Sequence, residues 1–375
     1  MISTRLHGLI DYTVASLLGT LAVAGPLPPP MRRVLGTAAA CHVSYAALTD
    51  YEGGLQPRIS MRAHLALDVL GAVGLCGAAL LLRRQPTSQR ALLFAAGVAE
   101  LAVVAASSAM PVRGPGQGAG PVDRLVGRRS HPNHASYPPL DTPKRFAEDV
   151  FVVDSVLPGV LERVLPVRMT VVRLPNGDLL LHSPTRYSIA LKLELEKLGR
   201  IRHLAAPSFG HWIHMLEWQQ ACPDAVTWAA PGLRKRSQVR RSGLRLDHDL
   251  SEMASSAFGH AITLAVVPGG LGFNEVALFH QPSRTLVLTD LVLNLERKKL
   301  PALARPLLQL FGVTAPDGMP PPYLRAIVKM QGVAAADTAR RLLALHPERV
   351  IFSHGRCFDR DGEAALRRSL RWLLG

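Results

Sequence analysis

Residues Ile262-Thr-Leu-Ala-Val-Val267, Glu275-Val-Ala-Leu-Phe279 and Thr285-Leu-Val-Leu-Thr289 are three short apolar runs that decide the fold of the C-terminal part. Each run is rich in β-branched or aliphatic residues, and turn-forming residues such as Pro268-Gly-Gly-Leu-Gly272 separate one run from the next. Runs of this length and composition between turn residues are typical of strands. The stretch therefore predicts three consecutive strands, the last of which leads into Asp290.

Strands and helices alternate on both sides of this stretch, from about Phe146 to the end of the sequence. Further strands are expected at Asp149–Asp154, Arg168–Leu174, Leu179–His182, His203–Ala206, Ala225–Ala229 and Arg349–Phe352. Helices are expected at Ser188–Leu198, Met215–Ala221, Ala335–Leu345 and Gly362–Leu374. This alternation predicts an α/β domain, which we place at residues 144–375.

The first 110 residues have a different pattern, in which four apolar stretches are separated by short polar or proline-rich breakers. The stretches are Leu6–Ala24, Val34–Leu48, Ala63–Leu82 and Ala91–Met110. About 20 apolar residues in a helix are enough to cross a bilayer. Residues 1–110 therefore predict an all-α four-helix transmembrane bundle, with a water-soluble Ala/Leu-rich bundle as the alternative. The second stretch is the shortest and the most polar of the four.

The bundle carries a duplicated motif. Arg5-Leu-His-Gly-Leu-Ile-Asp11 and Arg62-Ala-His-Leu-Ala-Leu-Asp68 both read R-x-H-x-x-x-D, at an offset of 57 residues. The duplication predicts two similar helical hairpins with both ends on one side. A His and an Asp four positions apart lie on the same face of a helix.

Ionisable groups inside a bilayer usually face the interior of the helix bundle, so His7, Asp11, His64 and Asp68 are expected there. His42 and Glu100 add polar groups on the other two helices. Such a cluster can bind a metal or relay protons, or its members can simply join the helices by hydrogen bonds. The hairpin pair is loosely similar to small bacterial membrane domains of the SPW-repeat kind, although the Ser-Pro-Trp motif is absent.

Residues 111–143 are rich in Pro, Gly and polar residues and predict a linker between the two domains. His131 and His134 fall in this segment and are expected to be solvated rather than to bind a metal. The sequence has a formal net charge of +15, which suits a domain near an anionic membrane surface. Arginines around the predicted spans favour cytoplasmic termini, so we expect a multi-pass inner or plasma membrane protein with its α/β domain in the cytoplasm.

The C-terminal part resembles a known family at several motifs. They are Arg168-Met-Thr-Val-Val-Arg-Leu174, Leu181-His-Ser-Pro184, Ala206-Pro207 with His211 and His214 before Glu217-Trp218, Asn274-Glu275-Val276, His280 through Asp290-Leu291, and Ser353-His354-Gly355. In these motifs residues 146–375 resemble the uncharacterised bacterial family DUF4336, a domain of unknown function. The resemblance implies the αββα sandwich of the metallo-β-lactamase fold.

In that fold, a His-rich loop, a further His, a bridging Asp and a final His hold one or two divalent metals. The resemblance places Asp290 at the Asp position and His354 at the final His position. His211 and His214 stand in the first loop, with Ser208 near the place of its first His. The further His is missing, so the resemblance implies a single metal held by His211, His214, Asp290 and His354. Zinc, iron or manganese suits such nitrogen and oxygen donors.

Two more residues are candidates for catalysis. Glu275 could replace the missing His or act as a base, or it could pair with Arg284. His182 ends a predicted strand and could line the cleft or bind backbone groups. No nucleotide-binding motif or nucleophile elbow is present to suggest a different chemistry.

Two classes of function follow from these residues. The first is a membrane-anchored, metal-dependent hydrolase of an ester, lactone, amide or phosphoester, with a small anionic substrate. The second is a degenerate, non-catalytic domain that binds a ligand or partner at the membrane. Membrane lipid is an expected partner, specific nucleic-acid binding is not expected, and the sequence does not define an oligomeric state.

Overall fold

The computed structural model describes residues 2, 4–51, 53–56, 58–107, 135–156, 165–302 and 304–375. His131, His134 and most of the predicted linker lie outside these residues. The chain divides into two compact units. The first is Met1–Gly114 together with Arg236–Gln238, and the second comprises Pro115–Lys235 and Val239–Gly375.

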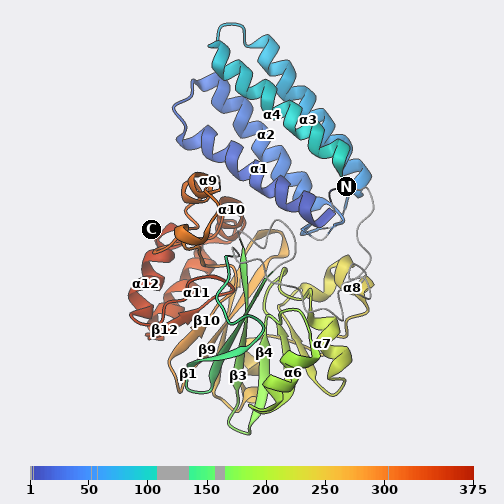
Figure 1. Cartoon of the computed structure of the whole chain (residues 1–375). Coiled ribbons are helices and arrows are strands. Elements are labelled where there is room, and N and C mark those ends of the chain that lie inside the picture. The colour runs from blue at the N-terminus through green and yellow to red at the C-terminus, as the bar shows by residue number, and fades with distance from the viewer. Residues whose placement is uncertain are drawn as a thin grey trace. The chain divides into compact units, whose positions relative to one another are not determined.

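The first unit contains four long helices that lie alongside one another (Figure 1). They are α1 (Thr4–Ala24), α2 (Pro29–Leu48), α3 (Met61–Leu81) and α4 (Thr87–Ala106). Pro28, Pro29 and Pro30 begin α2, where the missing amide hydrogens of proline cost no helical hydrogen bond. The predicted four-helix architecture is confirmed.

Three of the four helices, α1, α3 and α4, are long and apolar enough to cross a membrane. Helix α2 is as long but contains Arg32, Arg33 and His42, which agrees with its lower predicted hydropathy. Several large apolar side chains of α3 and α4 are exposed, including Leu70, Leu81 and Phe94. Leu18, Met31, Leu35, Leu75 and Leu93 are instead buried between the helices and form the core of the bundle.

The second unit is built on two main sheets. The larger has the strand order β1 (Pro143–Ala147), β2 (Val150–Val156), β3 (Pro166–Arg173), β4 (Asp178–His182), β5 (Arg200–Ala206), β6 (Val226–Ala229) and β7 (His248–Asp249). The smaller has the order β12 (Arg349–Ile351), β10 (Thr285–Val287), β9 (Asn274–His280) and β8 (Ile262–Pro268). A short parallel pair, β11 (Leu293–Asn294) and β13 (His354–Gly355), completes the strands described.

The two main sheets face each other across one apolar core. Val152, Leu180 and Trp228 contribute to it from the larger sheet, and Leu264 and Leu278 from the smaller one. Alternate residues of these strands point into the core, as expected for sheets packed face to face.

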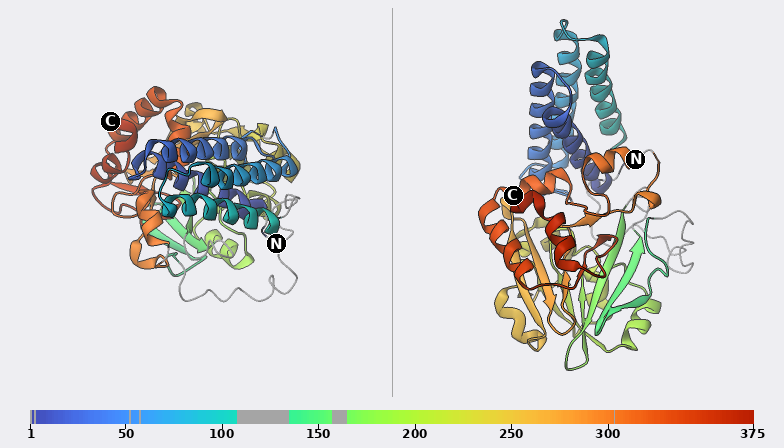
Figure 2. Two further views of the ribbon diagram at one scale, coloured as in Figure 1. Left: turned by 90° about the horizontal axis from the view of Figure 1, so that it is seen from above. Right: turned by 90° about the vertical axis from the view of Figure 1, so that its left-hand side faces the viewer.

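Helices cover the outer faces of both sheets (Figures 1 and 2). Helices α6 (Ile189–Glu196) and α7 (Met215–Ala221) pack on β5, whereas α11 (Gly332–Ala344) and α12 (Gly362–Ser369) pack on β8 and β12. The remaining helices are α8 (Ser237–Ser242), α9 (Arg305–Leu310), α10 (Pro322–Lys329) and α13 (Arg371–Leu374), with short 3-10 turns between elements. This layering is the αββα sandwich predicted from the sequence.

The described residues just before β1 pack on the sandwich instead of forming a free linker. Ala135 and Ser136 are buried, and the Ser136 hydroxyl donates a hydrogen bond to the carbonyl of Ser155 at 2.8 Å. The Lys299 ammonium group lies 3.5 Å from the ring centroid of Tyr137. Residues 135–143 therefore pack with the α/β domain, whose start the sequence analysis placed at residue 144.

Candidate metal centre

Three of the predicted ligands come from loops at one edge of the two sheets. His211 lies in the loop after β5, Asp290 follows β10, and His354 begins β13 just after β12. Strands β10 and β12 are parallel neighbours, so their carboxyl ends meet at the same edge and bring Asp290 and His354 together.

The side chains of these three residues converge on the Asp290 carboxylate. The His211 Nε2 atom lies 3.2 Å from both Asp290 oxygens. The His354 Nε2 atom lies 3.2 Å from Asp290 Oδ1, and the two imidazole centroids are 5.5 Å apart. The three ligand atoms all lie within 4.8 Å of one another.

Both imidazoles are oriented by a contact at their other nitrogen. His354 Nδ1 donates to the carbonyl of Pro166 at 2.8 Å, which leaves the lone pair of the neutral ring on Nε2. His211 Nδ1 lies 2.6 Å from the hydroxyl of Ser183. A metal-binding His typically uses its second nitrogen in this way, because the contact fixes the ring and directs the coordinating nitrogen.

The donor set and its spacing fit a divalent metal. Two ligand atoms about 2.1 Å from a tetrahedral metal are about 3.4 Å apart, close to the 3.2 Å separations found here. Burial opposes ionisation of Asp290, but the charges and hydrogen bonds of His211 and His354 outweigh it and hold the pKa of Asp290 well below its ordinary value. The carboxylate is therefore ionised and available as a ligand.

Glu275 holds the loop that carries Asp290. Its carboxylate is fully buried and accepts hydrogen bonds from the backbone amides of Thr289, Asp290 and Leu291, at 2.7, 2.9 and 3.1 Å. It does not pair with Arg284, whose side chain contacts Glu348 at 3.4 Å. Burial and the nearby Asp290 charge raise the pKa of Glu275, while the amides act against that rise. Glu275 thus positions Asp290, and of the alternatives left open by the sequence the pair with Arg284 is not formed.

His182 lies beside the centre, at the end of β4. Its side chain is buried, and neither ring nitrogen has a hydrogen-bond partner among the described residues. Burial and the neighbouring His211 lower the pKa of His182 to about 3, so its ring is neutral at physiological pH. A buried neutral imidazole with unbonded nitrogens, next to a ligand-like His, is consistent with a role in the same site.

His214 does not join the other three residues. It precedes α7, and its Nδ1 atom lies 3.7 Å from a carboxylate oxygen of Glu217. Two residues, Trp212 and Ile213, separate it from His211, and α7 begins directly after it. Among the described residues, the group that can hold a metal here is His211, Asp290 and His354, without His214.

Two residues that stand in the quoted motifs, but to which the sequence analysis gave no role, support the centre. Arg168 is buried and donates to the carbonyls of Phe352 and Gly355, at 2.9 and 2.8 Å, on either side of His354. Ser183 has a φ of +56°, unusual for a residue with a side chain, and this places its hydroxyl against His211. The sequence offered one signal for each residue: Arg168 is a charged residue inside an apolar strand, and Ser183 is a polar residue just after a strand end.

The last position of the Ser353-His354-Gly355 sequence requires glycine. Its φ is +103°, and a Cβ atom at this position would lie 2.3 Å from the carbonyl oxygen of Asn294. Only glycine allows β13 to approach β11 so closely, and the pairing of Leu293 with His354 fixes the backbone of the ligand.

Comparison with known proteins gives a match to one family within the second unit. Residues 148–313 match DUF4336, a domain of unknown function. The DUF4336 match includes His182, His211, Glu275 and Asp290, whereas His354 lies beyond its end. It is shorter than the span of 146–375 suggested by the motifs. No curated protein matches the chain.

Solved structures similar to the chain include several metallo-β-lactamases. The enzyme from Pontibacter korlensis is 13% identical, with a TM-score of 0.41 over 62% of this chain and 97% of that one. The enzyme from Erythrobacter litoralis is 12% identical, with a TM-score of 0.42 over 62% and 91%. The mono-zinc form of FIM-1 from Pseudomonas aeruginosa is 16% identical, with a TM-score of 0.41 over 61% and 94%.

Proposed function

We propose that the second unit is a metal-dependent hydrolase with a single-metal centre formed by His211, Asp290 and His354. The observation that carries the proposal is the convergence of two Nε2 atoms on one carboxylate, each within 3.2 Å. Three protein ligands with one open position are typical of catalytic metal sites, whereas structural sites use four.

A divalent metal bound at such a centre supplies Lewis-acid chemistry and activates water for attack on an acyl or phosphoryl group. Asp290 and the two imidazoles would hold it, and Glu275 and Arg168 would keep their loops in place. His182 remains neutral at physiological pH, so it would bind water or substrate by hydrogen bonds and not as a cation. Esters, lactones, amides and phosphoesters are the substrate classes that this chemistry serves.

We also propose that the first unit anchors the chain in the inner or plasma membrane, with the second unit on the cytoplasmic side. Three sufficiently long apolar helices and the exposed Leu70, Leu81 and Phe94 side chains support the anchor. The net charge of +15 favours anionic lipid headgroups and a small anionic substrate over neutral ones.

The hydrolase proposal is tested on the full chain purified in detergent. Metal content is measured by mass spectrometry for the wild type, for Asp290→Ala with His354→Ala, and for His280→Gln. His280 is a matched control, because it is a buried histidine that bonds Ser283 away from the centre. The double variant is expected to lose one equivalent of metal and all hydrolysis of a chromogenic ester, lactone, amide and phosphoester panel. The control is expected to keep both.

A second function is favoured by one observation. His214 is turned toward Glu217, so the described residues supply fewer ligands than the sequence implied. This would fit a non-catalytic domain that binds a ligand or partner at the membrane. Retention of metal without hydrolysis of any substrate in the panel would favour this function. Equal metal content in the wild type and the double variant would refute the metal centre itself.

A further inference from the structure

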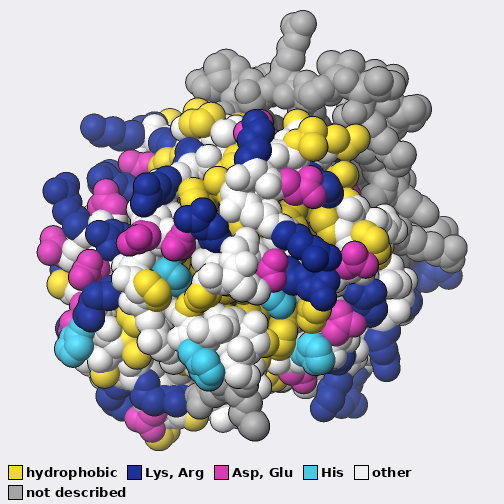
Figure 3. Space-filling model, turned by 90° about the horizontal axis from the view of Figure 1, so that it is seen from below, with side chains coloured by type: hydrophobic (Ala, Val, Ile, Leu, Met, Phe, Trp, Pro, Cys, Tyr) yellow, Lys and Arg dark blue, Asp and Glu magenta, His cyan; other side chains and the backbone are white. Residues whose placement is uncertain are grey.

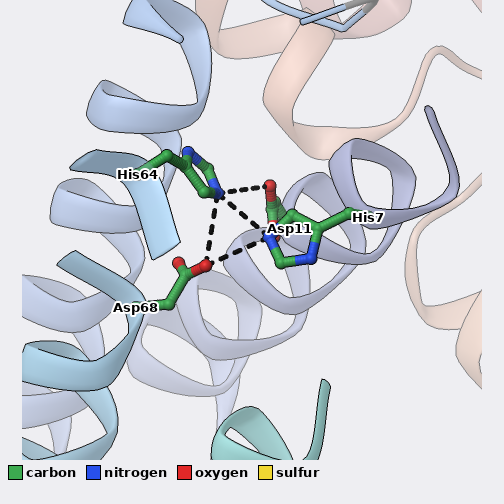
Figure 4. Close-up of side chains that lie close together, drawn as sticks. All are labelled: His7, Asp11, His64 and Asp68. Carbon is green, nitrogen blue, oxygen red and sulfur yellow. Dashed lines mark hydrogen bonds and ion pairs between the residues drawn. The ribbon is translucent and has the colours of Figure 1, made fainter. Parts of the chain in front are cut away.

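The first unit holds a second cluster of ionisable side chains, unrelated to the centre described above. His7 and Asp11 come from α1, and His64 and Asp68 come from α3 (Figure 4). All four are buried, with at most 2% of any residue exposed. Each helix contributes one His and one Asp four residues apart, so both side chains lie on the face that meets the other helix.

The four side chains point at one centre. The two Nε2 atoms are 3.1 Å apart (Figure 4). His7 Nε2 lies 3.0 Å from Asp68 and 3.3 Å from Asp11, and His64 Nε2 lies 3.0 Å from Asp11 and 3.3 Å from Asp68. These separations are close to the roughly 3.4 Å expected between neighbouring ligands of a tetrahedral metal.

Two hydroxyl groups determine which nitrogen of each imidazole carries the proton. The Thr49 hydroxyl donates to the carbonyl of Tyr45 at 2.7 Å and therefore accepts from His64 Nδ1, also at 2.7 Å. The Ser107 hydroxyl donates to the carbonyl of Val103 at 2.6 Å and accepts from His7 Nδ1 at 2.7 Å. Both neutral rings consequently direct the lone pair of Nε2 at the centre.

These hydroxyls occupy equivalent places in the two repeats. Thr49 follows α2 and forms a parallel bridge with Ile59, which precedes α3. Ser107 follows α4 and forms a parallel bridge with Ile2, which precedes α1. Each repeat thus supplies a His–Asp pair and receives a hydroxyl contact through the same backbone arrangement. The centre lies where the repeats meet, a common place for sites in duplicated membrane folds.

The charge of the cluster also favours a cation. Among the described residues, Asp11 and Asp68 form ion pairs with histidines alone, so with neutral imidazoles two buried carboxylates keep their negative charge, which is costly inside a bundle. Two added protons would neutralise the cluster but would place two positively charged N–H groups on nitrogens only 3.1 Å apart. One divalent cation neutralises the carboxylates and gives every inward-facing lone pair a partner.

We propose that His7, Asp11, His64 and Asp68 bind one divalent transition-metal ion between α1 and α3. Two imidazole nitrogens and two carboxylate oxygens form a donor set suited to zinc, iron, manganese or cobalt. Four protein ligands in a buried position describe a closed site, which stabilises the junction of the two repeats and leaves no position for a substrate. Figure 4 shows that the ligands come from one helix of each repeat.

The experiment uses the full chain in detergent, in the Asp290→Ala with His354→Ala background, so that the centre of the second unit does not contribute. The protein is stripped with a chelator and titrated with Co²⁺, whose visible absorption reports coordination. One equivalent is expected to bind with the strong absorption of four-coordinate cobalt, and Zn²⁺ is expected to displace it. His7→Gln with His64→Gln is expected to abolish this binding. His280→Gln, at a buried histidine of the second unit that bonds Ser283 and contacts none of the four ligands, is the matched control and is expected to keep it.

A further variant keeps the test decisive if the double glutamine variant does not fold. His64→Cys retains a ligand, so Co²⁺ is expected to give a sulfur-to-cobalt charge-transfer band in the near ultraviolet. Failure of the parent chain to bind Co²⁺, or absence of that band from folded His64→Cys, would overturn the proposal. Binding unchanged by His7→Gln with His64→Gln would also overturn it, and the cluster would then be a hydrogen-bonded joint between the helices.

Discussion

Substitution of Glu275 tests how the metal centre depends on the loop of Asp290, without removing a proposed ligand. Replacing Glu275 with Gln leaves one acceptor oxygen where the carboxylate offers two, and it turns an amide N–H₂ group toward backbone amides. At least one of the Thr289, Asp290 and Leu291 amides then loses its buried partner, which costs about 1–3 kcal/mol. We expect urea unfolding, followed by tryptophan fluorescence, to report a loss of that size together with weaker metal retention.

The matched control is Glu348→Gln. Glu348 is an exposed glutamate that contacts Arg284 and Arg349, so its substitution is expected to change stability by less than about 0.5 kcal/mol. All four tryptophans, Trp212, Trp218, Trp228 and Trp372, lie in the second unit, so their fluorescence follows the unfolding of that unit. Equal stability of Glu275→Gln and Glu348→Gln would contradict the positioning role.

His203 makes the second unit sensitive to acid. Burial, assisted by the Arg202 charge and opposed by Asp178, lowers the pKa of His203 from 6.5 to about 4. Between these values the unfolded chain binds a proton that the folded chain does not, so stability falls as the pH falls from 6.5 to 4. The full loss is at most about 3 kcal/mol. His203→Gln, which keeps an acceptor for the Trp228 indole, is expected to reduce this dependence.

The measurement compares the free energy of unfolding at pH 7 and pH 4.5 for the wild type and His203→Gln. His260→Asn is the control, since His260 is exposed and its positive φ of +58° suits asparagine. The control is expected to leave the pH dependence unchanged. A wild-type slope preserved in His203→Gln would show that other groups cause the acid sensitivity.

At the scale of elements, the sequence predicts the helices and strands that have a periodic apolar pattern and misses those that are too short to have one. The strands β2–β6, β8–β10 and β12 and the four N-terminal helices carry a regular apolar pattern, so their existence was predicted and only their ends shifted by a few residues. Strands β7, β11 and β13 have two residues each, too few for any periodicity, and were missed, as were strand β1 and the six-residue helices α8 and α9. Helix α10 was missed as well, because prolines surround its start.

The same reasoning explains why the positions of Asp290 and His354 could be predicted from the sequence and the position of His214 could not. Asp290 and His354 follow strand ends, and a parallel pair of strands brings such ends together wherever the sheet forms. The orientation of His214 depends on how the loop turns into α7, which is set by tertiary contacts and not by spacing. The three-residue interval between His211 and His214 therefore could not show that only His211 reaches Asp290.

Strand β3 is the element that connects the larger sheet to the loop of His354. Arg168 of β3 pairs with Asp154 at 2.7 Å and also donates to the carbonyls on either side of His354. Arg168→Met leaves these buried acceptors without their donor, and removal of one member of a buried ion pair costs about 3–5 kcal/mol. We expect a loss of this size in urea unfolding and a lower metal content.

Arg173→Met is the control on the same strand. Arg173 is 46% exposed and pairs with Asp149 at the surface, where ion pairs contribute about 0–1 kcal/mol. Similar stabilities for Arg168→Met and Arg173→Met would mean that the buried arginine does not hold the loop.

At the scale of the whole molecule, the formal net charge is +15. On the face seen in Figure 3, Lys and Arg side chains are interspersed with Asp and Glu and do not form one uninterrupted basic patch. Nucleic-acid binding proteins usually concentrate their basic residues on one face. Both partner expectations, no specific nucleic-acid partner and contact with lipid headgroups, stay predictions.

Leu70 tests whether the bundle lies in a membrane. It is near the middle of α3, and 67% of the residue is exposed. An exposed leucine there contacts lipid if the helix spans a bilayer, and a charge at the centre of a span costs about 2.5–3.5 kcal/mol on insertion. We therefore expect the wild type and Leu70→Val to stay in the membrane fraction after alkaline carbonate washing and to need detergent for release. Leu70→Arg is expected to lower the inserted fraction. If the bundle is instead a water-soluble domain, the wild type appears in the supernatant without detergent, and Leu70→Arg only improves its solubility by covering an apolar surface.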